Sequence, residues 1–526
     1  MATVVTNISQ GKLRGSKCYT DKGTEYFEFL GIPYAKPPVG DLRFKSPQPP
    51  EKWDGIRDAT IVSESQFSCQ VDLLGHHVVG TEDCLYLCIF SPNLPKANTS
   101  PNLLPVMFSI HGGGFLHQNG IKDIGPDYLI DNNVVVVSIN YRLGIFGFLS
   151  LDMPEASGNM GLKDQVQALV WVQNNIHIFG GDKNNITITG ISAGSASVEY
   201  LILSPKSKGL FHKAILQSGS CLNHWAINYE PKKLLHKFLE KLGYEGSTQD
   251  YLEIYQYLMS CSPVLLAEKS FLAVHESCPD RLFFGFVPTI EKDFGNEEAF
   301  LTAKPYKLLK EGNFNKVPVI KGFCKKEGYL MDLAKQGAIY DLIKNKDFVR
   351  HFAYSLERND YSKYNAKFRN VYRFTELDED IGVDFFGDYD FVSGIWISGQ
   401  MMLNHGVTVY FYRFSYDGKM NFLKNLFNIK KEGASHADDV SYVFKKEFSE
   451  LANDYDIVVR DKITKMWTNF AKTSNPVPPC SDLQPWPAFT PSTPVYLNID
   501  KEFTIESEYE PRRMDVFSEI LDKYEM

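Results

Sequence analysis

Residues 186–203 read ITITGISAGSASVEYLIL, and this stretch decides the fold. The β-branched run 186–189 predicts a short strand, and residues 195–203 have the apolar spacing of a helix. Between them stands Gly190-Ile191-Ser192-Ala193-Gly194, a G-x-S-x-G pentapeptide in a strand–turn–helix context. This arrangement is typical of a nucleophile elbow, a tight turn that exposes a serine hydroxyl at the end of a strand. A glycine-rich turn without chemistry is the alternative until partners for Ser192 are found.

Strands and helices alternate on both sides of this turn. Short apolar or β-branched runs predict strands at 104–110, 134–141, 186–189, 317–323 and 407–414. Segments of helical period lie at 163–178, 195–203, 231–242 and 455–473. Such alternation predicts an α/β fold with a large, mostly parallel central sheet flanked by helices. Functional residues of such sheets gather on loops at the carboxyl ends of the strands.

The predicted strand 104–110 is followed directly by His111-Gly112-Gly113-Gly114. Acyl transfer places negative charge on a carbonyl oxygen, and preorganised backbone N–H groups stabilise that charge. Glycines leave those N–H groups accessible to a substrate, whereas a bare triple glycine could also be a flexible turn. HGGG upstream of G-x-S-x-G is the pairing of oxyanion loop and nucleophile found in esterases and lipases.

Ser192 would need a base and an acid, and in this architecture both follow the serine along the chain. Of the 12 histidines, His436 lies in a glycine-containing loop, whereas His351 and His405 lie in or at the end of helical segments. Glu327 follows the predicted strand 317–323 and is the better acid. Its rival Asp438 is only two residues from His436 and could not easily reach the ring. A metal site at His436, Asp438 and Asp439 is the weaker interpretation, because no second histidine lies nearby.

Composition limits the class of protein. The chain has 526 residues, 44% of them hydrophobic, and a net charge of −9. This charge argues against a nucleic-acid binder. No apolar run is long enough to span a membrane, and the N-terminus has no signal-peptide pattern, so we expect a cytoplasmic protein, or a secreted one if a leader is missing from the chain. The nine cysteines are scattered without a metal-binding rhythm. Nothing in the sequence indicates an oligomeric state.

Further motifs carry a resemblance to a known family. They include Phe29-Leu30-Gly31-Ile32-Pro33-Tyr34-Ala35, Thr81-Glu82-Asp83-Cys84-Leu85, Asn140-Tyr141-Arg142, Gly161-Leu162-Lys163-Asp164-Gln165, Phe179-Gly180-Gly181-Asp182 and Phe470-Ala471-Lys472-Thr473. With the elbow and the HGGG loop, the chain resembles the type-B carboxylesterases, cholinesterase-like α/β-hydrolases, over essentially its full length. Around His436 it is most similar to intracellular insect α-esterases. The resemblance implies a single α/β-hydrolase domain spanning residues 1–526.

The resemblance also implies roles for individual residues. Ser192 would be the nucleophile, Glu327 the acid and His436 the base of a serine carboxylesterase that needs no cofactor or metal. The oxyanion N–H groups would come from Gly113, Gly114 and Ala193. The acyl pocket would be lined by Trp225, Leu282 and Phe284, although ordinary core packing is the alternative for these three. Structural salt bridges would join Arg43 to Glu82 and Arg142 to Asp164.

Two departures from the family pattern bear on the substrate. Ile191 stands where the family usually has a glutamate beside the nucleophile. The loop between Cys69 and Cys84, which carries a choline-binding tryptophan in cholinesterases, contains no Trp, Tyr or Phe. Both departures argue against a quaternary ammonium substrate. We therefore expect a small neutral, apolar ester, such as a hormone, odorant or xenobiotic ester.

Two other functions are compatible with the same fold. A non-catalytic adhesion or scaffold protein of this family typically loses part of the triad, and here each part is present. A sequestering esterase keeps the chemistry but deacylates slowly, and the sequence does not distinguish it from an ordinary esterase.

Overall fold

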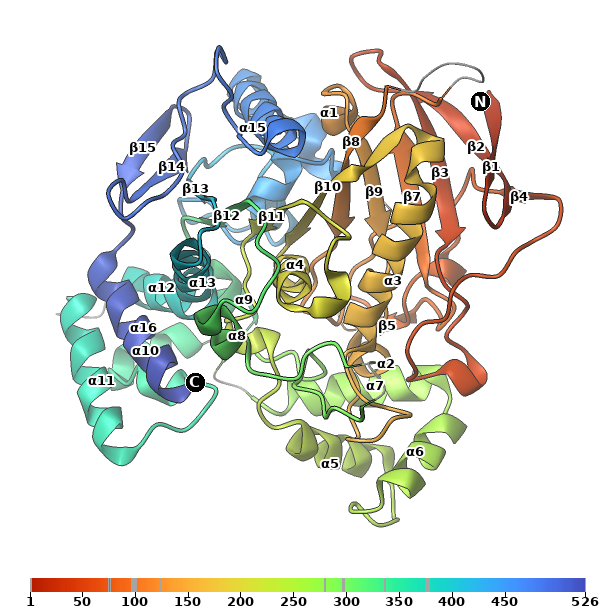
Figure 1. The fold of residues 1–526 in the computed structure, drawn as a ribbon. Coiled ribbons are helices and arrows are strands. Elements are labelled where there is room, and N and C mark those ends of the chain that lie inside the picture. The colour runs from red at the N-terminus through yellow and green to blue at the C-terminus, as the bar shows by residue number, and fades with distance from the viewer. Residues whose placement is uncertain are drawn as a thin grey trace.

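One large mixed sheet forms the centre of the molecule (Figure 1). The computed structural model describes residues 2–73, 75, 77–95, 102–122, 124–278, 281–295, 299–334, 337–373 and 379–525. Within these ranges the sheet has thirteen strands. In sheet order they are β1 (Thr3–Ile8), β2 (Gly11–Tyr19), β3 (Glu25–Pro33), β7 (Tyr86–Ser91), β9 (Val135–Ile139), β8 (Leu104–Ile110), β10 (Gly181–Ile191), β11 (Lys213–Gln217), β12 (Val319–Cys324), β13 (Val409–Phe414), β14 (Val495–Ile499) and β15 (Phe503–Ser507), with β4 (Ile56–Asp58) beside β2. A separate pair consists of β5 (Gln70–Val71) and β6 (Val78–Val79).

The centre of the sheet is parallel, and its edges are antiparallel apart from the parallel pair β2–β4. The run from β9 through β8, β10, β11, β12 and β13 to β14 is parallel throughout. The strands from β1 to β3 and on to β7 and β9, and the pair β14–β15, are antiparallel. The five predicted strands correspond to β8, β9, β10, β12 and β13, and the expectation of a large, mostly parallel central sheet is confirmed. β11 and the antiparallel edges are additions that the sequence analysis did not predict.

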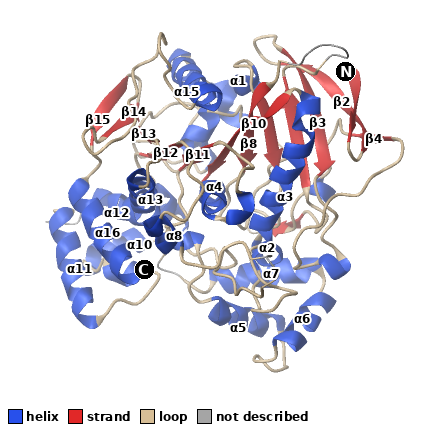
Figure 2. Ribbon diagram, viewed as in Figure 1, coloured by secondary structure: helices blue, strands red, loops and turns tan. Residues whose placement is uncertain are grey.

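Helices cover both faces of this sheet (Figure 2). On β8, Val106, Phe108 and Ile110 belong to the buried cluster that includes α3 (Met160–Asn175) and α4 (Ala193–Leu203). Met107 belongs to the cluster that includes α15 (Asp454–Thr473). This alternation of side chains along one strand fixes which helices lie on which face. The helices are α1 (Asp127–Ile130), α2 (Gly144–Phe148), α3 (Met160–Asn175), α4 (Ala193–Leu203), α5 (Pro231–Leu242), α6 (Tyr251–Ser260), α7 (Pro263–His275), α8 (Pro305–Glu311), α9 (Tyr329–Ala334), α10 (Ala338–Asn345), α11 (Arg358–Val371), α12 (Glu379–Gly387), α13 (Ser393–Asn404), α14 (Phe422–Leu426), α15 (Asp454–Thr473) and α16 (Pro511–Tyr524).

The predicted helices are α3, α4, α5 and α15, and α4 shows the most informative difference in its bounds. It begins at Ala193 rather than at residue 195, because Ser192 already occupies the N-cap position. The helix therefore starts directly at the serine, and the N–H of Ala193 lies at the turn. Since β8, β10, β11 and β12 are parallel, the segments that follow them lie at one edge of the sheet. Each candidate residue on those segments is thereby brought to the same region.

Candidate active site

Ser192 occupies a strained turn between β10 and α4. Its backbone dihedrals are φ 57° and ψ −122°, a conformation that L-residues rarely adopt. Glycines allow the crossing of β10 and α4: a Cβ at Gly190 would lie 2.3 Å from backbone atoms of Gly194, and a Cβ at Gly194 would lie 2.1 Å from the carbonyl oxygen of Ile110. The Ser192 N–H donates to the carbonyl of Gln217 at the end of β11, at 2.8 Å. The elbow predicted from the sequence is therefore present.

Glu327 and His436 form a buried pair. The ring Nδ1–H of His436 donates to Oε2 of Glu327 at 2.6 Å, and the two residues are 3% and 1% exposed. Their loops meet because the N–H of Lys326 donates to the carbonyl of Ala434 at 2.8 Å. With a proton on Nδ1, the ring can present Nε2 as a proton acceptor, which suits the predicted role of His436 as a base.

The second oxygen of Glu327 is also held. Oε1 accepts from the backbone N–H of Cys324 at 2.7 Å and from the Ser218 hydroxyl at 2.6 Å. The Phe391 ring packs against the His436 ring, with 4.3 Å between ring centroids. Neither Ser218 nor Phe391 was singled out from the sequence. The signal for Ser218 is its position directly before Gly219 and directly after β11, a strand too short to stand out.

The carboxylates beside His436 are engaged elsewhere. Asp438 accepts from the backbone N–H groups of Ser435 at 2.6 Å and Lys424 at 3.1 Å. Asp439 accepts from the Gln217 amide at 2.9 Å and from the Tyr412 hydroxyl at 2.7 Å. The geometry therefore favours Glu327 over Asp438 as the partner of the histidine. Burial raises the pKa of the Asp438 carboxyl to about 8.

Ser192 and His436 line one cavity of about 220 Å³. Gly112, Gly113 and Gly114 form part of its wall, and a Cβ at Gly112 would lie 3.1 Å from the Cβ of Ser192. The remaining wall is mostly apolar and includes Leu73, Ile110, Ile124, Ile191, Phe284, Leu330, Phe422, Leu423, Phe427, Val440 and Phe444. The cavity thus places the serine, the histidine and the glycine loop around one apolar space.

The glycine loop presents free backbone donors. Gly113 and Gly114 have φ of 96° and 63°, and a Cβ at Gly113 would lie 2.2 Å from the carbonyl oxygen of His117. Among the described residues, no protein acceptor takes a hydrogen bond from the N–H of Gly113, Gly114 or Ala193. Three unpartnered N–H groups beside a serine are what a developing oxyanion requires.

His111 supports this loop as a neutral side chain. Its Nδ1–H donates to the carbonyl of Gly112 at 2.9 Å, and its ring stacks on Tyr141 with 4.5 Å between centroids. Burial lowers the pKa of His111 to about 4. The ring is therefore uncharged at neutral pH.

The three residues expected in the acyl pocket have different positions. Phe284 lines the cavity with Ser192, and a Cβ added at Gly114 would lie 2.8 Å from its ring. Trp225 is buried behind Phe284, with 5.7 Å between ring centroids, and its Nε1–H donates to the carbonyl of Asp390 at 2.7 Å. Leu282 is buried and lines a neighbouring cavity. A substrate-binding role remains a prediction for all three.

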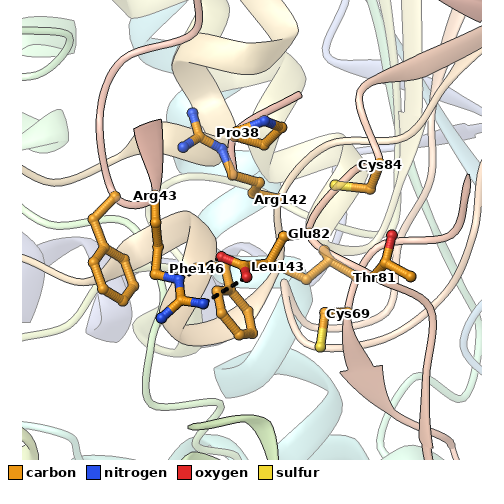
Figure 3. A pocket seen from close by; sticks show the side chains of 10 residues that line it. Pro38, Arg43, Cys69, Thr81, Glu82, Cys84, Arg142, Leu143 and Phe146 are labelled. Carbon is orange, nitrogen blue, oxygen red and sulfur yellow. Dashed lines mark hydrogen bonds and ion pairs between the residues drawn. The ribbon is translucent and has the colours of Figure 1, made fainter. Parts of the chain in front are cut away.

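The two salt bridges implied by the resemblance are present away from Ser192. Arg43 binds Glu82 through two hydrogen bonds of 2.6 and 2.7 Å, and Figure 3 shows this pair beside Cys69 and Cys84. Arg142 binds Asp164 in the same bidentate way, at 2.8 and 2.7 Å.

Cys69 and Cys84 are both buried free thiols. Burial raises the pKa of Cys69 to about 12 and that of Cys84 further. In the loop between them, Leu74 and His76 lie outside the described residues.

Comparisons with known proteins show the family of the chain. A family model described as the carboxylesterase family matches residues 2–517. The chain is 36% identical to juvenile hormone esterase of Tribolium castaneum over 501 residues, 89% of this chain and 83% of that protein. It is 35% identical to esterase E4 of Myzus persicae over 496 residues, 90% of this chain and 87% of that protein.

A solved structure is similar over almost the whole chain. It is the crystal structure of juvenile hormone esterase from Manduca sexta with OTFP covalently attached. The TM-score is 0.87 at 29% identity, and the match covers 99% of this chain and 100% of that one. The predicted α/β-hydrolase fold is thereby confirmed. No helix in the described ranges is long and apolar enough to cross a membrane. The chain is a carboxylic ester hydrolase and belongs to the carboxylesterase family.

Proposed function

We propose that the chain hydrolyses neutral, apolar carboxylic esters through a triad of Ser192, His436 and Glu327. The observation that carries this proposal is the 2.6 Å hydrogen bond from His436 to Glu327 at the wall of the cavity that Ser192 also lines. Nε2 of His436 takes the Ser192 proton as the hydroxyl oxygen attacks the ester carbonyl. The alcohol leaves with that proton, and water then repeats the sequence on the acyl-enzyme.

The tetrahedral intermediates would be stabilised by three backbone donors. The N–H groups of Gly113, Gly114 and Ala193 are free of protein acceptors in the described part of the chain, which supports their assignment to an oxyanion hole. Because these donors are fixed by the glycine loop and by the start of α4, they need no reorganisation as charge develops.

The cavity favours a neutral substrate with an apolar acyl or alcohol group. Its wall is rich in aliphatic and aromatic side chains, and Ile191 beside the nucleophile supplies no negative charge. Burial of each substrate methylene would contribute about 0.8 kcal/mol. The name of one relative, juvenile hormone esterase, supports a hormone ester as one candidate substrate.

A pair of matched esters tests this proposal. We expect 1-naphthyl butyrate to be hydrolysed with a kcat/KM at least about tenfold higher than butyrylcholine, because each missing cation contact is worth roughly 0.5 to 2 kcal/mol. Equal or greater activity on the choline ester would show that a cation site exists. A burst of one alcohol per chain followed by very slow turnover would instead favour a sequestering role.

A further inference from the structure

A second cavity, of about 320 Å³, lies on the other side of the acyl-pocket wall. The segment from Arg281 to Phe284 separates the two spaces. Leu282 and Phe283 line the second cavity, whereas Phe284 lines the cavity at Ser192. Trp225 packs on Phe284 and thickens this wall. The second cavity is therefore a neighbour of the catalytic one with its own lining.

Cationic side chains dominate the polar part of this lining. Arg281, Lys233 and Lys237 contribute three positive charges, and Glu230 contributes one negative charge. Glu230 is paired with Lys233 at 3.0 Å, and Lys237 donates to the backbone carbonyl of Glu276 at 2.9 Å. A carbonyl does not neutralise an ammonium group, so an excess of positive charge faces the cavity.

Arg281 has no carboxylate partner among the described residues. One guanidinium nitrogen donates to the carbonyl of Phe352 at 3.3 Å, while the buried Nε has no hydrogen-bond acceptor. Burying a charged donor without an acceptor is costly, and arginine in such positions usually meets a carboxylate. The planar guanidinium can accept a carboxylate through two parallel hydrogen bonds.

Apolar side chains make up the rest of the wall. Leu234 and Leu282 are 4% and 2% exposed, and Ile227 and Phe283 line the same cavity. Together with Arg281 they form a space that has cationic groups on one part of its wall and apolar side chains on another. A small inorganic anion would leave the apolar part unfilled, and a neutral lipid would leave Arg281 unpaired.

We propose that this second cavity binds an amphiphilic monocarboxylate, with its carboxylate on Arg281 and its apolar tail against Leu234 and Leu282. This binding site does not depend on the chemistry at Ser192. If the proposed function holds, the acid released by ester hydrolysis belongs to the same chemical class, and product and free fatty acid are the two sources of such a ligand.

The test is a titration of decanoate into the full chain whose Ser192 has been blocked with a phosphonate. We expect saturable binding of one decanoate per chain, with each methylene in a series from hexanoate to decanoate tightening binding by about fourfold. Acetate and decanol, which lack the tail and the carboxylate respectively, should each bind at least about tenfold more weakly than decanoate. To distinguish the sources, binding of the acids released from the esters that the chain hydrolyses is compared with binding of fatty acids that it does not release. Tighter binding of the released acids would identify the product as the ligand, and tighter binding of the others would identify a free fatty acid.

Three variants make the test specific. Arg281→Gln should weaken decanoate binding by about tenfold or more, whereas Arg350→Gln, at an arginine paired with Asp341 at 2.8 Å outside this cavity, should bind as the unaltered chain does. Ala353→Leu should weaken binding by filling the cavity while leaving Arg281 in place. Stoichiometric phosphonate labelling of each variant reports that it is folded.

Three results would overturn the proposal: equal affinity in the Arg281→Gln and Arg350→Gln variants, equal affinity for decanol and decanoate, or loss of decanoate binding on blocking Ser192. A failure of the phosphonate to label Ser192 would count against the proposed function instead. The comparison of Arg281→Gln with Arg350→Gln on unlabelled protein would still decide the second site.

Discussion

Replacing Glu327 with glutamine tests the proposed acid of the triad most sharply. The carboxylate of Glu327 meets three donors: Nδ1–H of His436 at 2.6 Å, the Ser218 hydroxyl at 2.6 Å and the N–H of Cys324 at 2.7 Å. A carboxylate accepts all three hydrogen bonds, whereas an amide has one oxygen and an NH₂ group that only donates. Glu327→Gln therefore forces one of these contacts to change.

The contact that changes should be the hydrogen bond with His436. If the amide oxygen keeps Ser218 and Cys324, the NH₂ group points at Nδ1, which must then accept a hydrogen bond and move its proton to Nε2. An imidazole protonated at Nε2 cannot take the proton of Ser192. A comparable loss of the correct tautomer in another serine hydrolase costs about 10⁴ in kcat. We expect Glu327→Gln to lower kcat by about 10³ to 10⁴ while the fold of the chain changes little.

The assay is hydrolysis of 1-naphthyl butyrate, with kcat and KM measured separately and active sites counted by mass spectrometry. Asp438→Asn is the matched control, because the Asp438 side chain accepts from the Ser435 and Lys424 backbone N–H groups rather than from the histidine ring. We expect this control to retain kcat within about tenfold. The assignment of Glu327 would be refuted if kcat fell less than tenfold in Glu327→Gln. It would also be refuted if kcat fell more in Asp438→Asn than in Glu327→Gln.

Three further predictions concern the nucleophile, a buried histidine and a buried ion pair. An organophosphate should add one phosphyl group per chain at Ser192, and peptide mass spectrometry of the Ser192→Ala variant should find none; an adduct on another residue would move the nucleophile. Because burial holds the pKa of His111 at about 4, below the value of about 6.5 in the unfolded chain, its contribution to stability is complete above about pH 6.5 and is lost as the pH falls towards 4. Urea midpoints at pH 7 and pH 5 should therefore differ less in His111→Gln than in the unaltered chain, and equal differences would contradict this reasoning. Lys321 and Glu199 form an ion pair in which both side chains are fully buried, so Lys321→Met should lower the unfolding free energy by about 3 to 5 kcal/mol. The double change with Glu199→Met should recover part of that loss in chemical denaturation, and no recovery would mean that the cost comes from packing alone.

The sequence was informative wherever backbone geometry demands a particular residue. Gly190 and Gly194 are needed because any Cβ there would collide with neighbouring backbone, so the pentapeptide in its strand–turn–helix context predicts the turn around Ser192. The sequence was less informative for β11, whose apolar run is only a few residues long. The sequence also did not predict which of the two cavities Leu282 lines, because that depends on the path of a loop rather than on a repeating pattern. The same limit hid Ser218, which acts only through its contact with Glu327.

The hydrogen bond between His436 and Glu327 has a consequence for how the chain acquires activity. It joins residues 109 positions apart, and the turn at Ser192 comes from a third, still earlier segment. Contacts of such long range form late, since loop closure must precede the interactions that reward it. During refolding, esterase activity should therefore return later than helical content. The return of esterase activity would then report the final assembly of the sheet rather than the initial collapse of the chain.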